Sequence, residues 1–404
     1  MDRILYWLGL LWLPVYGLAH LWPRDKRLWL FGSTFGKRFT DNPRYLYLWL
    51  TARKETGIRC VWMSRNKEVV DFLSSKGLEA CHTKSLKGAL LALRAGVYIY
   101  DNYSKDINFP LSGGALKVNL WHGVGNKRIN HDNLHDKVRH PKNLWERWTT
   151  FPRRMSDEKP SDYVLCTSEE MGRYFAKAFK SAPGHVICEG YPRCDALFDT
   201  GKELLNVMTA SEEKLRAKIE SFRSKGKRIV AYLPTFRASE KEFLHVMDME
   251  AFDAYLGEKN YVFVVKPHPK SVIKEAFKGE EYKNIMVVNS DVDVYTYLGA
   301  ADMLVTDYSS VYTDYMLLDR PVGAFCYDSD KYETESRDYF IDQRQYMPEL
   351  VAVSMKELEE CMDAAFEKDE CRQARLVSRA RMFDKPDGNS CERVYKRICR
   401  ILTL

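Results

Sequence analysis

The chain has 404 residues, which is long enough for two or three domains of ordinary size. Its composition, 45% hydrophobic and 29% charged, excludes an intrinsically disordered protein. The formal net charge is only +6, but basic residues are concentrated at 126–154, which favours an anionic partner. The 10 cysteines contain no CxxC pair, so we expect buried, reduced thiols and neither a disulfide framework nor a zinc site.

The first 24 residues form an apolar segment that we expect to associate with a membrane. This segment contains Trp7 and Trp12 and carries no formal charge from residue 4 to residue 22. Because Pro14 interrupts it, an in-plane helix fits as well as a spanning one, and a buried helix packed on the first domain is the alternative. Basic residues follow at 24–27 and no signal-peptide cleavage site is evident. We therefore expect a peripheral or monotopic protein at the cytoplasmic face of the cell membrane.

Short apolar runs then alternate with helical patterns along the chain. Predicted strands lie at 28–31, 59–64, 97–100, 117–121 and 163–167 in the first half, and at 228–233, 261–265, 285–288, 303–305 and 322–325 in the second. Such alternation is typical of a parallel, doubly wound sheet, and it restarts after a charged segment at 200–227. We therefore predict an α/β fold with two Rossmann-like domains facing a cleft, at 25–200 and 201–375, and a helical segment at 376–404.

The predicted strand at 117–121 ends in the sequence Trp-His-Gly, which places His122 and Gly123 at a turn. A glycine turn leaves the imidazole accessible and lets backbone N–H groups approach a ligand. Histidine is also the side chain best suited to accept a proton near neutral pH. The sequence therefore indicates a candidate base. The alternative is a histidine that the backbone satisfies at the end of a buried strand.

Three later strands also end in polar motifs that suit a phosphorylated ligand. Pro-Thr-Phe-Arg follows the strand at 228–233, Lys-Pro-His-Pro follows the strand at 261–265, and Thr-Asp-Tyr-Ser-Ser follows the strand at 303–305. An arginine fork, a cation beside a histidine, and hydroxyls with N–H groups at the start of a helix can each bind an anion. Each motif also has a structural alternative, a rigid surface loop or an ordinary helix cap. A fifth motif, Gly-Tyr-Pro-Arg-Cys-Asp at 190–195, is predicted to be a hinge or part of the site.

In this order the five motifs resemble those of the CDP-glycerol glycerophosphotransferases of teichoic acid and capsule assembly, over residues 121–310. The resemblance implies a GT-B fold. It implies that His122 activates the acceptor hydroxyl as a base, and that His268 binds the pyrophosphate and stabilises the departing CMP. The donor-binding residues that it implies are Gly123, Arg193, Thr235, Arg237, Lys266, Thr306, Asp307, Ser309 and Ser310. The chain departs from the family's pattern at Cys194, where asparagine is common, and in the sequence that follows Trp-His-Gly.

The expected reaction is transfer of glycerol phosphate from CDP-glycerol to a hydroxyl of a membrane-linked acceptor, with release of CMP, in the synthesis of teichoic acid or a capsule-like polymer. Attack on the β-phosphorus needs positioning and stabilisation by cations or N–H groups. No acidic cluster in the sequence is typical of a metal site, so we expect no cofactor and no obligatory metal. Three alternatives stay open: transfer of ribitol phosphate from CDP-ribitol, a GT-B glycosyltransferase that uses a nucleotide sugar, and a non-catalytic membrane scaffold.

The basic segment at 126–154 also contains aromatic residues, a mixture that is typical of a membrane or acceptor surface. Beside the two N-terminal tryptophans, the residues that we expect to contact lipid or acceptor are Lys127, Arg128, Arg139, Trp145 and Trp148. The expected partners are therefore a CDP-polyol donor, a lipid-linked or polymeric acceptor, and the membrane surface. Nucleic acid is not expected, because the motifs suit a nucleotide donor. A solvated basic loop is the alternative for this segment, and homo-oligomerisation is left open.

Overall fold

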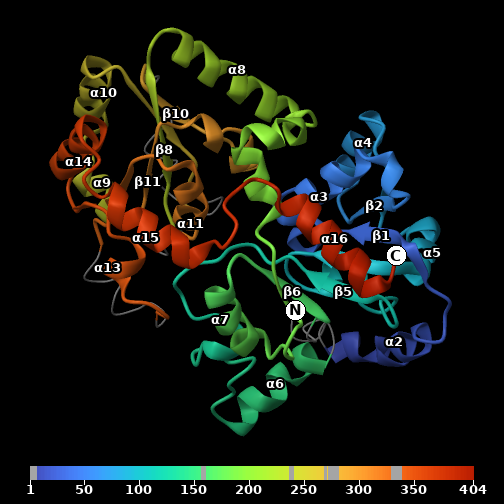
Figure 1. Cartoon of the computed structure of the whole chain (residues 1–404). Coiled ribbons are helices and arrows are strands. Elements are labelled where there is room, and N and C mark those ends of the chain that lie inside the picture. Colours follow the sequence, from blue (N-terminus) through green and yellow to red (C-terminus); the bar gives the residue numbers. More distant parts are fainter. Residues whose placement is uncertain (1–6, 156–160, 236–240, 268–270, 272–281, 329–338) are drawn as a thin grey trace. The chain divides into compact units, whose positions relative to one another are not determined.

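The computed structural model describes residues 7–155, 161–235, 241–267, 271, 282–328 and 339–404 (Figure 1). The chain divides into two compact units. Unit 1 contains Met1–His122, Arg128–Val207 and Phe383–Leu404, and unit 2 contains Gly123–Lys127 and Met208–Met382. The division after Val207 lies close to the boundary that we predicted at residue 200. The sequence did not indicate that the segment after His122 belongs to unit 2, or that the C-terminal segment returns to unit 1.

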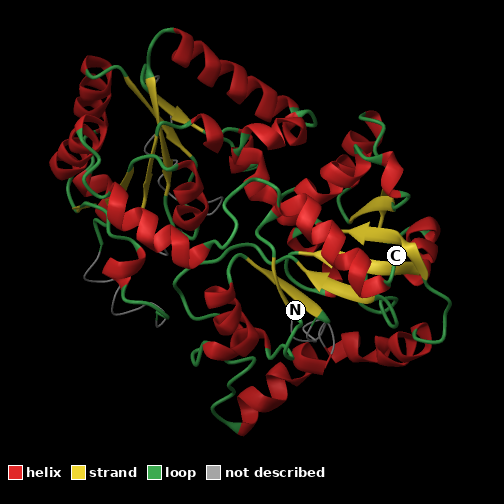
Figure 2. Cartoon of the chain, viewed as in Figure 1, coloured by secondary structure: helices red, strands yellow, loops and turns green. Residues whose placement is uncertain are grey.

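Unit 1 is built on a seven-stranded parallel sheet in the order β3-β2-β1-β4-β5-β6-β7 (Figure 2). Its strands are β1 (Asp25–Phe31), β2 (Arg59–Ser64), β3 (Ala80–His82), β4 (Ala95–Tyr100), β5 (Leu116–Asn119), β6 (Tyr163–Cys166) and β7 (Val186–Cys188). Most strand residues are buried, as expected of a parallel sheet that is covered on both faces. The order reverses between β1 and β4, and ligands of open α/β sheets bind at the carboxyl ends of strands at such a switch point.

The helices of unit 1 are α2 (Leu13–Ala19), α3 (Asp41–Thr51), α4 (Lys67–Ser75), α5 (Leu86–Arg94), α6 (Leu144–Met155), α7 (Glu169–Phe179) and α16 (Ser390–Leu402), with short 3-10 turns η1 (Leu10–Trp12), η2 (Thr34–Gly36), η3 (Lys54–Thr56), η4 (Ser104–Asp106), η5 (Asn130–Asp132), η6 (Pro192–Leu197) and η7 (Asp199–Leu205). Most of these helices lie between the strands of unit 1 in the chain, whereas α2 precedes β1 and α16 follows the last strand of unit 2. The side chains of Asn66, Ser85 and Ser168 cap α4, α5 and α7 by accepting backbone N–H groups. The C-terminal helix α16 lies beside α3 (Figure 1).

Unit 2 has a six-stranded parallel sheet in the order β10-β9-β8-β11-β12-β13, which reverses between β8 and β11. Its strands are β8 (Arg228–Leu233), β9 (Tyr261–Val265), β10 (Ile285–Val287), β11 (Met303–Thr306), β12 (Val322–Phe325) and β13 (Val351–Ala352). Its helices are α8 (Ala210–Ser224), α9 (Lys241–Val246), α10 (Met249–Glu258), α11 (Val311–Tyr315), α13 (Gln343–Tyr346), α14 (Met355–Glu367) and α15 (Arg372–Met382), with 3-10 turns η9 (Val294–Thr296), η10 (Leu298–Ala300) and η11 (Met316–Leu318).

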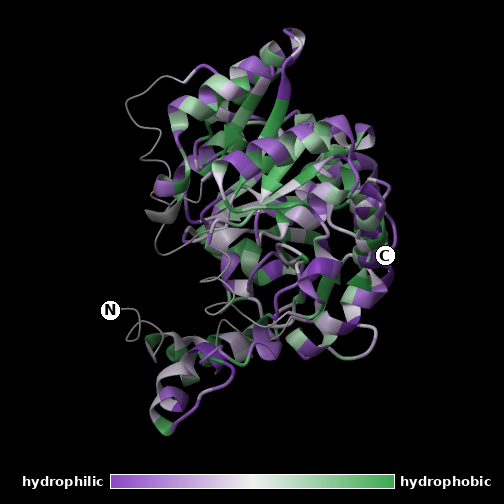
Figure 3. Cartoon of the chain, turned by 90° about the vertical axis from the view of Figure 1, so that its left-hand side faces the viewer, coloured by the Kyte–Doolittle hydropathy of each residue, from purple (hydrophilic) through white to green (hydrophobic). Residues whose placement is uncertain are grey.

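The cores account for much of the aromatic and cysteine content. In unit 2, Tyr232, Phe243, Phe252, Phe263 and Phe325 belong to one buried cluster. The sheet strands appear mostly in the hydrophobic colour in Figure 3. All 10 cysteines lie within the described residues, and most of them are buried, as predicted for cysteines that act as small apolar side chains.

The N-terminal segment forms η1 and α2. No helix among the residues that the structure describes has the length and apolar character needed to cross a bilayer. Instead, α2 is attached to unit 1 at its C-terminal end, where the guanidinium of Arg24 donates to the carbonyl groups of Ala19 (3.0 Å) and Ala92 (2.9 Å). Of the residues in α2, only Ala19 is buried, so the helix is docked on the surface and not enclosed in a core.

Candidate active site

The Trp-His-Gly motif places an exposed histidine close to the switch point of unit 1. β5 ends at Asn119, whose side chain accepts the N–H of Trp121 (2.8 Å), and Trp121 turns the chain through a positive φ of 52°. His122 follows, and its Nδ1 lies 3.0 Å from the backbone oxygen of Asp101, directly after β4. A carbonyl oxygen can only accept, so Nδ1 carries the hydrogen and Nε2 keeps its lone pair. This tautomer leaves Nε2 in the form that a general base needs.

Residues from distant parts of the chain fix the backbone of this turn. Asn42, at the start of α3, donates its side-chain amide to the carbonyl of Trp121 (2.9 Å). Arg193 is almost fully buried, and its Nη1 lies 2.8 Å from both the carbonyl oxygen of His122 and a carboxylate oxygen of Asp41. Because Asp41 and Asn42 are neighbours, α3 and Arg193 together determine where the imidazole is presented.

The hydrogen bonds of the Gly-Tyr-Pro-Arg-Cys-Asp motif with the His122 turn and with α16 lie within unit 1. Beside the contacts of Arg193, the buried carboxylate of Asp195 accepts the backbone N–H groups of Ser390 (2.9 Å) and Cys391 (2.7 Å) at the start of α16. Cys194, the departure from the family's pattern, is buried in η6. The motif thus connects the His122 turn with the C-terminal helix, and donor binding by Arg193 stays a prediction.

In unit 2, two predicted motifs meet at the switch point, because β8 and β11 are neighbouring strands. The buried carboxylate of Asp307 accepts the N–H (2.9 Å) and the hydroxyl hydrogen (2.6 Å) of Thr235. The hydroxyl of Thr306 donates to a backbone carbonyl of β8 (2.8 Å). As predicted, a helix, α11, begins directly after Ser310, and the hydroxyl of Ser309 accepts a backbone N–H of this helix (3.4 Å). These contacts join the two motifs, and donor binding by their residues stays a prediction.

The segment Gly123–Lys127 packs against the Thr-Asp-Tyr-Ser-Ser motif within unit 2. A Cβ atom on Gly125 would lie only 3.2 Å from the Cβ of Ser310, so the absence of a side chain permits this close approach. Asn126 anchors the segment, because its side chain donates to the carbonyl of Ile341 (2.7 Å) and accepts the N–H of the same residue (2.8 Å). The sequence did not predict this packing for us, although the Gly-x-Gly spacing after the histidine was a signal for it.

Two lysines belong to the same region of unit 2. Lys127 Nζ lies 5.9 Å from the centre of the Tyr308 ring, so a residue that we expected at a membrane or acceptor lies beside the predicted donor motif. Lys266 directly follows β9, where the sequence predicted a polar turn. His268 and Arg237, from the Lys-Pro-His-Pro and Pro-Thr-Phe-Arg motifs, lie outside the described residues.

Aromatic residues of the predicted membrane surface meet in unit 1. The ring of Trp7 lies 5.0 Å from that of Trp148, and the ring of Trp148 stacks on Trp145 at 5.4 Å. Trp12, Trp145 and Trp148 are 55%, 63% and 53% exposed, which is unusual for such large apolar side chains. The N-terminal segment and α6 therefore share one exposed aromatic cluster.

The two arginines of the predicted membrane or acceptor surface, Arg128 and Arg139, form ion pairs within unit 1. Arg128 pairs with Asp132 at 2.8 Å, and Arg139 pairs with Asp136 at 2.6 Å. The side chain of Arg139 is only 10% exposed. Both arginines thus support the loop that precedes α6, and their contact with lipid or acceptor stays a prediction.

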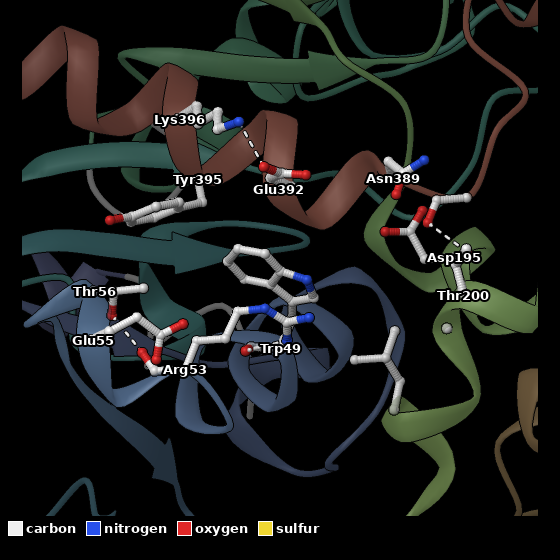
Figure 4. A pocket seen from close by; sticks show the side chains of 13 residues that line it. Trp49, Arg53, Glu55, Thr56, Asp195, Thr200, Asn389, Glu392, Tyr395 and Lys396 are labelled. Atoms are coloured by element: carbon white, nitrogen blue, oxygen red, sulfur yellow. Dashed lines mark hydrogen bonds and ion pairs between the residues drawn. The ribbon is translucent and has the colours of Figure 1, made fainter.

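A pocket of about 400 Å³ is lined by α3, α16 and the turns beside them in unit 1 (Figure 4). Trp49 and Tyr395 form its aromatic wall, with ring centres 5.7 Å apart. Its cations Arg53 and Lys396 are each paired with a glutamate at 2.6 Å. The pocket uses the end of α3 that lies away from Asn42, and none of the predicted site residues lines it.

Comparison with known proteins identifies the family. Residues 15–400 match the family described as CDP-glycerol:poly(glycerophosphate) glycerophosphotransferase. The chain belongs to this family. Among its relatives, a teichoic acid poly(glycerol phosphate) polymerase of Bacillus spizizenii is 26% identical over 344 residues, which are 83% of this chain and 82% of that protein. A teichoic acid glycerol-phosphate transferase of Staphylococcus aureus is 24% identical over 385 residues, 93% of each chain.

The same comparisons bear on fold and reaction class. A solved structure of the wall teichoic acid polymerase TagF is 21% identical, with a TM-score of 0.70, and the match covers 94% of this chain and 90% of that chain. This likeness confirms the predicted GT-B-like fold. Membership of the glycerophosphotransferase family confirms that the protein is a transferase. Teichoic acid ribitol-phosphate polymerases and a ribitol-phosphate primase are also among its relatives.

Proposed function

We propose that the protein transfers glycerol phosphate from CDP-glycerol to a hydroxyl of a membrane-linked acceptor, with release of CMP, in the synthesis of teichoic acid or a capsule-like polymer. Membership of the glycerophosphotransferase family over residues 15–400 supports this activity. The observation that carries it is the exposed imidazole of His122, whose Nδ1 is held by a backbone carbonyl so that Nε2 can accept a proton.

The reaction is a single displacement at the β-phosphorus of the donor. Nε2 of His122 takes the proton of the acceptor hydroxyl while the oxygen of this hydroxyl forms a bond to the β-phosphorus. The bond between this phosphorus and the bridging oxygen breaks, and CMP leaves with the electron pair and the negative charge. The product is a phosphodiester that joins glycerol phosphate to the acceptor. Positioning and charge stabilisation suffice for this step, so it needs no covalent enzyme intermediate.

The donor diphosphate binds the motifs at the switch point of unit 2 in this proposal. Support comes from the positions of Lys127 and Lys266 and from the hydroxyls of Ser309 and Ser310. Lys266 follows β9 and the two serines follow β11, the strands on either side of β8, and Lys127 lies beside Tyr308. Cations and N–H groups stabilise the phosphoryl charge, so no cofactor and no obligatory metal is proposed. The family resemblance assigns stabilisation of the departing CMP to His268, which lies outside the described residues.

The proposal places the protein at the cytoplasmic face of the membrane as a peripheral protein. Large apolar side chains are exposed on α2, α6 and their flanks, namely Leu11, Trp12, Leu18, Leu21, Leu144, Trp145 and Trp148. Arg153 and Arg154 lie in the last turn of α6. Because Arg24 fixes α2 to unit 1, the apolar residues of α2 are presented in a defined orientation. Such a surface suits lipids with anionic headgroups.

The test is release of CMP from CDP-glycerol by detergent-solubilised protein with a lipid-linked acceptor mimic. We expect turnover by the wild type and a loss of about 10²-fold or more in His122→Ala, because general-base catalysis contributes on this order. His135→Ala, which replaces an exposed histidine of unit 1, is the matched control and should keep the wild-type rate. A wild-type rate of CMP release in His122→Ala would exclude His122 as the general base.

Parallel arms of this assay decide between the alternatives. CDP-ribitol is the second candidate donor, because relatives of the chain include teichoic acid ribitol-phosphate enzymes. Nucleotide sugars test a glycosyltransferase, and a chelator tests the absence of a metal requirement. Turnover of a nucleotide sugar without release of CMP from either CDP-polyol would overturn the phosphotransferase proposal. No turnover of any donor would favour the non-catalytic scaffold.

A further inference from the structure

Two buried carboxyl groups lie beneath the turn that presents His122. Asp101 directly follows β4, and Asp106 lies in η4. Their exposed fractions are 1% and 0%, although the reaction proposed above uses neither side chain. Burial of a carboxyl group is unfavourable unless hydrogen bonds compensate for the lost hydration. The contacts of the two groups therefore indicate what they do.

Asp101 connects the switch point of unit 1 with the imidazole. Its carboxylate accepts hydrogen bonds from the hydroxyl of Ser33 (2.5 Å) and the backbone N–H of Thr34 (3.1 Å), in the loop after β1. Its backbone oxygen accepts the hydrogen of Nδ1 of His122 (3.0 Å). The carboxylate thus fixes the same residue whose carbonyl selects the tautomer of the imidazole.

Asp106 binds the backbone of the same two loops, which follow β1 and β4. Its carboxyl oxygens accept the backbone N–H groups of Phe35 (2.8 Å) and Asn102 (3.0 Å), and Asn102 also donates its side-chain amide to Asp101 (2.7 Å), so one residue joins the two carboxyl groups. Burial raises the pKa of both carboxyls, and the pKa of Asp106 rises well above its ordinary value because Asp101 is its neighbour. The charge of Asp41 also raises the pKa of Asp101, whereas His122 and the hydrogen-bond donors of Asp101 lower it. Three groups donate to the carboxylate of Asp101, namely Ser33, Thr34 and the side chain of Asn102, whereas two backbone N–H groups donate to Asp106, so a proton held by the pair belongs to Asp106.

We propose that this pair is a positioning element for His122, in which Asp101 is the charged member and Asp106 is the member that carries the proton. The inference rests on the proposed function, because it assigns the pair to the base of that reaction. When Nε2 takes the acceptor proton, the imidazolium gains stabilisation from the charge on Asp101. Among the described residues, Asp41 also acts on this pair by raising the pKa of Asp101, and it forms an ion pair with Arg193.

Variants of similar size and shape can distinguish the roles of the two carboxyl groups. Asp106→Asn keeps a neutral group where the protonated carboxyl stands and loses one of its two acceptors of backbone N–H groups, so kcat should fall by no more than about threefold. Asp101→Asn removes the charge. It should lower kcat about tenfold or more, leave KM for CDP-glycerol unchanged, and move the acidic limb of the pH profile to lower pH. Similar effects of both variants on the profile, or none, would overturn the inference.

A second measurement does not depend on turnover. Nitrogen chemical shifts of the imidazoles are recorded by NMR against pH without donor, and the His122 signals are assigned with His122→Ala. The wild type should show hydrogen on Nδ1, and protonation of His122 should occur at lower pH in Asp101→Asn but not in Asp106→Asn. Unchanged protonation in Asp101→Asn would exclude the charged role. If the titrations behave as expected while no CDP-polyol is turned over, the proposed function fails and the positioning inference stands.

Thermal unfolding of both variants controls for folding. Should Asp101→Asn fail to fold, Ser33→Ala removes one hydrogen-bond donor of Asp101 and keeps the charge in place. We then expect a smaller shift of the His122 titration in the same direction, because a carboxylate with fewer donors favours its protonated form. A titration identical to that of the wild type would contradict the role of Asp101.

Discussion

The contacts of Arg193 link two motifs that are far apart in the sequence. Its guanidinium holds the carbonyl oxygen of His122 and the carboxylate of Asp41, and its side chain is only 4% exposed. The family resemblance suggested donor binding for this residue, whereas the geometry suggests that it positions the base. The two roles differ in kinetics, since a lost donor contact raises KM and a misplaced base lowers kcat.

Arg193→Lys separates these roles. Lysine keeps the charge, but its side chain is one atom shorter, so its ammonium nitrogen does not reach the position from which Nη1 of Arg193 contacts both oxygens. We expect kcat to fall about tenfold with KM for CDP-glycerol changed less than about twofold, and the free energy of unfolding to fall by about 1–3 kcal/mol. Arg53→Lys is the matched control, because Arg53 pairs with Glu203 away from the His122 turn. A raised KM at constant kcat would show donor binding instead.

Among the elements, α2 is fixed to unit 1 at its C-terminal end and exposes apolar side chains along the rest of its surface. Gly113 permits the docking, because a Cβ atom there would lie 2.2 Å from the carbonyl oxygen of Tyr16. The ring of Tyr16 also stacks on Phe109, with centres 4.9 Å apart. Short helices of this kind depend on tertiary packing for their stability, so a change at Gly113 is expected to displace α2.

Gly113→Ala should therefore weaken binding to vesicles that contain phosphatidylglycerol by about tenfold or more, since the apolar residues of α2 lose their common orientation. Gly17→Ala is the matched control within α2, because nothing lies within 4 Å of a Cβ at that position. Both variants should release CMP at the wild-type rate with a water-soluble acceptor. Co-sedimentation with vesicles measures the effect, and equal binding of the two variants would exclude the role of α2.

At the scale of the whole molecule, the chain passes between the units after His122, Lys127, Val207 and Met382. The candidate base is thus the last residue of unit 1 before the chain enters unit 2, and the stability of unit 1 decides whether it is presented correctly. A half-buried histidine, His131, couples this stability to pH. Burial, followed by the charges of Lys180 and Arg139, lowers the pKa of His131 to about 4.

His131 should make unit 1 less stable in acid. Its folded pKa lies below the unfolded value of about 6.5, so its contribution is complete above this pH and is lost as pH falls toward 4. Between pH 7 and pH 5, the free energy of unfolding should fall by about 1 kcal/mol more in the wild type than in His131→Gln, after allowance for solvent screening. Thermal unfolding at both pH values measures this. His135→Gln, an exposed histidine, should behave like the wild type.

The sequence by itself determined the parallel sheets and the polar motifs at their strand ends. Both follow from local pattern, because strands that are buried on both faces are continuously apolar and ligand-binding residues lie where such strands stop. The positions of His122, Thr235, Lys266 and Ser309 at strand ends could be predicted in this way, and their roles stay predictions. The family resemblance, carried by the order of these motifs, predicted the GT-B-like fold and the transferase class that the comparisons confirmed.

Only the tertiary structure decided what surrounds the base. Arg193 reaches His122 across 71 residues and Asp41 across 152 residues of the chain, and Asp195 reaches α16 across 195. The buried pair of Asp101 and Asp106 likewise depends on how the loops after β1 and β4 pack. No local periodicity encodes such contacts, because they arise when separate strands are brought into register within one sheet.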